Sequence, residues 1–114
     1  MLLNGGTYNG VQILRPATVK FLGGHTLSAV QQAGFDNWIG LEGFSYGNLM
    51  RVLVDPTRAV TLGSKGEFGW DGWLGAYFCV SPEDNLVLLY MMQKVDTGTV
   101  DVTRKVRSAV FAAL

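Results

Sequence analysis

The chain has 114 residues, of which 48% are hydrophobic and 16% charged, and nine Lys and Arg balance nine Asp and Glu. This composition predicts one globular domain over residues 1–114 and excludes a disordered chain, a basic nucleic-acid-binding protein and a membrane-spanning run of roughly 20 apolar residues. The N-terminus lacks the basic and apolar regions of a secretory signal, so we expect a cytoplasmic protein without a membrane partner.

Short helices are predicted in the N-terminal part of the chain. Pro16 suits the first position of a helix, because its missing N–H has no partner there, and the helix over 16–22 ends at the two glycines that follow. Ser28 is a favourable N-cap for one more helical turn over 28–33.

Three strands are predicted over residues 46–54, 68–80 and 85–93, where apolar residues alternate or form short continuous runs. The first strand ends before Pro56, which has no N–H to give to a sheet. The other two form a β-hairpin across the turn Ser81-Pro82-Glu83-Asp84-Asn85, whose residue types favour tight turns.

The chain closes with a loop over 94–100 and a predicted helix over 101–114. Asp101 suits an N-cap, and its charge suits the positive end of the helix. The apolar residues at helical spacing predict the packed face, and the basic residues Arg104, Lys105 and Arg107 are interpreted as a solvated face. The apolar set is Val102, Val106, Ala109, Val110, Ala113 and Leu114.

These elements predict an α+β fold: a three-stranded antiparallel meander with the C-terminal helix on one face and the short N-terminal helices at one edge. Trp38 is expected to pack over the sheet. Cys79 is interpreted as a small core residue and His25 as a loop or capping residue. One Cys and one His do not make a zinc site, and no cofactor is predicted.

The segment GEFGWDGWLGAYFCVSPEDNLVLLYMMQ resembles the C-terminal hairpin of the serine β-lactamase-related family, which includes class C β-lactamases, DD-peptidases and lactamase-like esterases. MLLNGGTYNGVQILRPATV is similar to the helix–loop–helix just before the family's final sheet strands. SYGNLMRVLVDP is similar to the strand that precedes the family's C-terminal hairpin. The resemblance implies the C-terminal sheet-and-helix portion of such a fold, in a family of serine hydrolases.

The nucleophile that the resemblance requires is missing from this sequence. Members of the family use a Ser-x-x-Lys at a helix start, and none of the five serines here is followed by Lys at the third position. Tyr46-Gly47-Asn48 fits the family's Tyr-x-Asn literally, but it lies in the wrong segment and is interpreted as chance. No catalytic residue is therefore predicted.

A ligand site is predicted at Trp70, Asp71, Gly72 and Trp73, where the resemblance places the family's Lys-Thr-Gly or Trp-Gly-Gly motif. The backbone N–H of Trp73 would serve an oxyanion hole. Asp71 replaces Gly or Thr, Trp73 replaces a small residue and Ala76 stands where Thr is usual, which together indicate a site no longer used for catalysis. Trp70 and Trp73 would stack on a flat or cationic ligand, unless both are core or interface residues.

Two functions compete on these grounds. The first is a non-catalytic, stand-alone lactamase-like domain that binds a partner or a small molecule. The second is a fragment or subunit of a serine hydrolase whose Ser-x-x-Lys lies elsewhere. A folded domain without a selected ligand remains a third possibility.

A homo-oligomer is predicted, because one helix covers one face of the sheet only. The other face and an unpaired strand edge would then be exposed and invite a second copy. Trp38, Trp70 and Trp73 are the expected anchors of that interface.

Overall fold

The structure, a computed structural model, describes residues 1–95 and 101–114. Its helices are α1 (Pro16–Gly24), α2 (Ala29–Phe35) and α3 (Asp101–Phe111). Its strands are β1 (Thr7–Tyr8), β2 (Val11–Gln12), β3 (Phe44–Tyr46), β4 (Arg51–Leu53), β5 (Phe68–Asp71), β6 (Tyr77–Ser81) and β7 (Leu86–Tyr90). No helix within these residues is long and apolar enough to cross a membrane.

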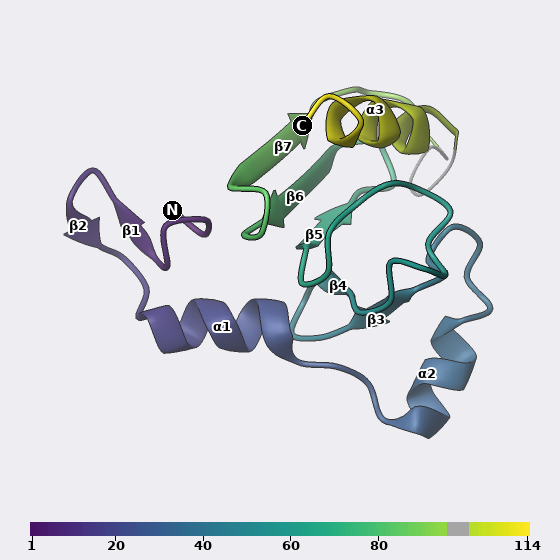
Figure 1. The fold of residues 1–114 in the computed structure, drawn as a ribbon, viewed down its shortest axis with the longest axis horizontal. Coiled ribbons are helices and arrows are strands. Elements are labelled where there is room, and N and C mark those ends of the chain that lie inside the picture. The colour runs from purple at the N-terminus through teal and green to yellow at the C-terminus, as the bar shows by residue number, and fades with distance from the viewer. Residues whose placement is uncertain (96–100) are drawn as a thin grey trace.

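The strands form one antiparallel sheet in the order β3-β4-β5-β6-β7 and a separate pair, β1-β2 (Figure 1). The α+β class and the antiparallel meander are confirmed, but the prediction of three strands is wrong. The predicted strand 46–54 is two strands joined by a turn, and the predicted strand 68–80 is likewise β5 and β6. The hairpin of β6 and β7 around the turn after Ser81 is confirmed.

Turn chemistry explains why the two long predicted strands break. Between β3 and β4, the Gly47 N–H donates to Met50 O at 2.8 Å, and Leu49 adopts a left-handed φ of 70°. A side chain on Gly47 would place Cβ 2.5 Å from His25 O, so this corner requires glycine. Gly47-Asn48 between two apolar runs is a recognised hairpin signal.

The sheet has a packed row on each face. Val52, Phe68 and Val80 follow one another across three strands and contact Val19 of α1. Residues an odd number of positions away along these strands point to the opposite face, where α3 lies; Tyr77, three positions before Val80, is one of them (Figure 1). The sheet therefore separates α1 from α3.

The packed face of α3 differs from the predicted apolar stripe. Its buried residues are Thr103 and Arg107, whereas Val102 is exposed. The prediction that Arg107 is solvated is wrong, because its guanidinium forms an ion pair with the buried carboxylate of Glu67. Asp101 is the first helical residue rather than the N-cap. The predicted loop 94–100 lies largely outside the described residues.

The N-terminal helices lie close to their predicted positions in the sequence, but α1 packs on a face of the sheet and not at its edge as predicted. Pro16 begins α1, and His25 caps its C-terminus, as expected of a capping residue. Ser28 is the N-cap of α2, and its backbone N–H donates to the side chain of Gln31 at 3.1 Å. The Gln31 side chain thereby gives a partner to the backbone N–H of Ser28, which would otherwise have none at the start of the helix.

Candidate ligand-binding cleft

The predicted site residues lie at the end of β5 and in the loop of the hairpin that joins β5 to β6. Asp71 is the last residue of β5, and the Gly72 N–H donates to Ala76 O at 2.7 Å. The Gly75 N–H then closes a turn on Gly72 O at 2.9 Å, and Gly75 has a φ of +86°. A turn followed by a left-handed glycine is the usual form of a three-residue hairpin loop. The turn places Trp73 at the tip of the hairpin.

Trp70 is half-buried and forms a wall shared by two open clefts. The first, named the aromatic cleft, has a volume of about 370 Å³. The second, named the hairpin cleft, has a volume of about 340 Å³. The aromatic cleft is lined by Leu27, Gln31, Gly34, Phe35, Trp38, Tyr46 and Trp70, and the hairpin cleft by Trp70, Asp71, Gly72, Ala76, Tyr77, Phe78, Leu89 and Met91.

The aromatic cleft is held by ring contacts between separate elements. Tyr46 meets Trp70 edge to face at 5.2 Å between ring centroids, and Phe35 of α2 lies 6.1 Å from Tyr46. Trp38 stacks on Phe35 at 6.1 Å but stays 57% exposed, so it borders the cleft instead of packing over the sheet as predicted. Such rings give an apolar, flat-walled site.

Gly69 explains how β5 brings Trp70 to this position. A Cβ on Gly69 would lie 2.1 Å from Phe78 O and 2.7 Å from Cys79 Cα, so β6 lies too close to β5 for any side chain here. A glycine within a strand commonly marks such a close backbone approach. Trp70 is the next residue, on the opposite face, and therefore projects from a tightly paired segment.

Three of the four predicted site residues, Trp70, Asp71 and Gly72, line the hairpin cleft together. The Asp71 carboxylate is buried and paired with Arg51 at 3.0 Å, so its charge is already neutralised. Trp73 is 72% exposed and lines neither cleft. The four predicted residues are neighbours in the chain, but the side chains of Asp71 and Trp73 are directed to different surroundings.

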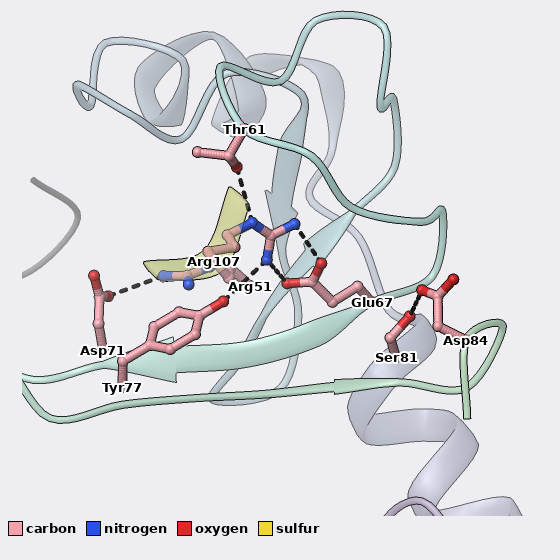
Figure 2. A network of polar contacts seen from close by, with 8 residues as sticks. All are labelled: Arg51, Thr61, Glu67, Asp71, Tyr77, Ser81, Asp84 and Arg107. Atoms are coloured by element: carbon pink, nitrogen blue, oxygen red, sulfur yellow. Dashed lines mark hydrogen bonds and ion pairs between the residues drawn. The ribbon is translucent and has the colours of Figure 1, made fainter. Parts of the chain in front are cut away.

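Asp71 and Tyr77, which line the hairpin cleft, also belong to a buried polar network that the sequence did not predict (Figure 2). Both nitrogens of the Arg107 fork donate to Glu67, its Nη1 also donates to Tyr77 Oη at 2.9 Å, and its Nε donates to Thr61 Oγ1 at 2.8 Å. Burial alone lowers the pKa of Arg107, but the hydrogen bonds and charge of Glu67 outweigh burial and raise it.

The ring of Phe44 is in contact with both buried guanidinium groups. Arg51 Cζ is 5.3 Å from its centroid and Arg107 Cζ is 5.5 Å. Cation–π attraction favours this position, and each arginine is also paired with a carboxylate. The network thus joins β4, β5, β6 and α3 behind the cleft wall. In the sequence these charged residues lie far apart, one on each element, and nothing in their pattern predicted the network.

Three of the five serines are part of hydrogen bonds that hold loops and turns. Ser45 accepts the Leu27 N–H, and Ser64 and Ser81 both donate to Asp84 in the turn after β6. Ser81 is fully buried, and burial raises the pKa of the Cys79 thiol to about 11, so neither presents a reactive group at the cleft. No cluster of metal-ligand side chains occurs among the described residues.

The Tyr46-Gly47-Asn48 triplet separates in space. Tyr46 lines the aromatic cleft, whereas the Asn48 amide donates to Phe21 O at the end of α1, at 3.1 Å. The two side chains therefore serve different contacts.

The chain was compared with family models, with curated proteins and with solved structures. No family model matches the chain. "Protein Rv1367c" and "Uncharacterized protein MT1414", from two strains of Mycobacterium tuberculosis, are each 33% identical to it over 113 residues. Each alignment covers 93% of this chain but 27% of the relative, so the chain spans about a quarter of their length.

Among solved structures, the chain is similar to "EstCE1, a hydrolase with promiscuous acyltransferase activity". The TM-score is 0.73 and the identity 23%, over 96% of this chain and 26% of EstCE1. The chain therefore has the α+β fold of about a quarter of a hydrolase.

Proposed function

We propose that this chain is a ligand-binding portion of a hydrolase-like fold, which takes an apolar small molecule in the aromatic cleft and does not itself carry out hydrolysis. The observation that carries the proposal is the shared wall formed by Trp70, with Tyr46, Phe35 and Trp38 around one volume. Ligand pockets of a few hundred Å³ lined by aromatic side chains are typical of small-molecule sites.

The ligand that this cleft favours is apolar and uncharged. The one carboxylate in the predicted site, Asp71, is paired with Arg51 behind the wall, so it offers no free charge to a cation. Flat rings of Trp70 and Tyr46 at the surface favour an aromatic or extended aliphatic group.

The binding test is a titration with N-phenyl-1-naphthylamine, an uncharged fluorescent probe. We expect Trp70→Ala to weaken binding at least tenfold, because that indole forms the shared wall. Trp73→Ala is the matched control, since Trp73 lies three positions along the chain and outside the cleft. Equal loss in both variants would place binding at the hairpin tip, and unchanged binding in Trp70→Ala would refute the cleft.

Absence of hydrolysis is supported by the sequence, in which no serine begins a Ser-x-x-Lys. A serine hydroxyl needs an adjacent base to act as a nucleophile. We expect no turnover of p-nitrophenyl butyrate or a chromogenic cephalosporin by this chain. Turnover that one serine substitution abolishes would contradict this, and all five serines should be tested.

The second candidate function is a part of an acyl hydrolase completed by residues elsewhere. It is favoured by the fold likeness to EstCE1, of which the chain matches about a quarter. The backbone N–H of Trp73, at the tip of the hairpin, would then donate to the oxyanion that forms when the substrate carbonyl is attacked. Mixing the chain with a separately produced fragment covering the rest of a mycobacterial relative tests this: ester turnover in the mixture alone supports it, and none at any ratio opposes it.

We further propose that a second copy of the chain covers the exposed apolar face beside β7. Val87 and Leu89 of β7 are 45% and 66% exposed, and Met91, just after the strand, is 77% exposed. Among the described residues β7 pairs only with β6. Trp73 and Leu74 at the hairpin tip are also exposed and extend this apolar surface. A stable interface buries about 1,200 Å² or more in total, so the second copy would have to cover both parts of it. An antiparallel pair of β7 strands would satisfy the open edge.

A further inference from the structure

A small polar cavity lies between the sheet and α3, behind the wall that carries Trp70. Its volume is about 20 Å³, larger than the roughly 10–15 Å³ that one water requires. It is lined by Gly40, Phe44, Arg51, Thr61, Asp71, Tyr77, Thr103, Arg104 and Arg107. Its walls therefore come from β3 to β6, α3 and the loops between them.

Two buried polar atoms of this lining have no hydrogen-bond partner among the residues that the structure describes, 1–95 and 101–114. They are Asp71 Oδ2 and Thr103 Oγ1, in residues that are 8% and 4% exposed. The other oxygen of the same carboxylate, Asp71 Oδ1, accepts from Arg51 at 3.0 Å. A buried polar atom without a partner costs about 1–3 kcal/mol, so two such atoms at one small cavity indicate that something binds both.

Tyr77 supplies a third polar group at the same cavity. Its oxygen accepts a hydrogen bond from Arg107 at 2.9 Å, which leaves its own proton to donate. Burial, the largest influence, raises the pKa of Tyr77 well above its ordinary value, so the phenol keeps that proton at neutral pH. The cavity thus offers an acceptor in Asp71 Oδ2, a donor in the Tyr77 hydroxyl, and the Thr103 hydroxyl, which can donate or accept.

The charges around the cavity select the occupant. Arg51, Arg104 and Arg107 oppose a cation, and the Asp71 carboxylate opposes an anion at the atom that needs a partner. The occupant must be neutral, donate to Asp71 and fit a volume of about 20 Å³. We propose that the cavity binds one structural water, which donates to Asp71 Oδ2 and bridges it to Thr103 Oγ1 and Tyr77 Oη.

This water joins α3 to the residue that immediately precedes the Gly72 turn. Thr103 stands one helical turn before Arg107, so α3 then holds the sheet through a water at one turn and an ion pair at the next. Buried waters of this kind make about three hydrogen bonds, the number of partners available here.

The test is the detection of a long-lived water by NMR, through water-to-hydroxyl and water-to-amide cross-relaxation near Thr103 and Tyr77. We expect the signals in the wild-type chain and in Thr103→Ser, which keeps the hydroxyl. We expect their loss in Thr103→Val, which has nearly the same shape but no oxygen. Wild-type protein without these signals, or Thr103→Val with undiminished ones, would overturn the proposal.

A high-resolution crystal structure of the wild-type chain provides a second measurement that does not depend on the variants folding. A single density peak within hydrogen-bond distance of Asp71 Oδ2 and Thr103 Oγ1 is expected. Soaking with bromide distinguishes an anion: an anomalous peak in the cavity would refute a water.

Discussion

Replacing Arg107 with Met should destabilise the chain strongly, because it leaves the Glu67 carboxylate buried without its partner. Glu67 is 1% exposed and Arg107 is 3% exposed, so water cannot take over the broken contacts. Removing one member of a buried ion pair costs about 3–5 kcal/mol. A domain of this size has about 5–15 kcal/mol of stability, so the change removes a large share of it.

Urea unfolding followed by tryptophan fluorescence measures this loss. With an m-value of about 1–3 kcal/mol per M, we expect the midpoint of Arg107→Met to fall by about 1 M or more. Lys105→Met is the matched control, since Lys105 is exposed on the same helix and should shift stability by less than about 0.5 kcal/mol.

A double variant separates the pair from the simple loss of a long side chain. Glu67→Leu with Arg107→Met removes both charges, and apolar replacement of a buried pair is often neutral or stabilising. We expect the double variant to recover at least half of the single variant's loss. A single-variant loss below about 1 kcal/mol, or a double variant no more stable than Arg107→Met, would refute the reasoning.

The remaining predictions concern pH and assembly. Burial raises the pKa of the Cys79 thiol to about 11, above that of an unfolded thiol, so its contribution to stability is complete below about pH 8.5 and is lost as the pH rises to 11. Urea midpoints should fall across that window, and Cys79→Ala should make the fall shallower; an identical slope in both proteins would contradict this. Sedimentation velocity at micromolar concentration should show a dimer, with Leu89→Lys shifting it toward a monomer of 12.4 kDa. A wild-type monomer at those concentrations would rule out the proposed second-copy interface.

The helices and the last hairpin were predictable because their signals are local. Pro16 at a helix start, Ser28 as an N-cap and the Ser81–Asn85 turn each specify backbone geometry within a few residues. The two missed turns also had local signals, in Gly47-Asn48 and in the glycines around Trp73. Apolar residues on both sides made each segment look like one continuous strand.

The polar network was not predictable, because its members lie far apart in sequence. Glu67 and Arg107 are 40 positions apart, and an isolated arginine on a helix is normally solvated. The same holds for Asp71, whose role depends on Arg51, 20 positions away. The motif resemblance predicted a ligand site at Trp70 and the three residues after it, whereas Tyr46, Phe35 and Trp38 lie beside Trp70 only because the fold brings them there.

The strand order of the sheet bears on how quickly the chain folds. Every strand from β3 to β7 pairs with its neighbour in sequence, so most sheet contacts close short loops and contact order in this part is low. The contacts of Arg107 on α3 close much longer loops, of 40 residues to Glu67 and 46 to Thr61, so we expect α3 to dock after the sheet has formed. Contacts made after the rate-limiting step slow unfolding without changing the folding rate. The network behind the cleft should therefore determine the lifetime of the native chain, whereas the meander determines how fast it forms.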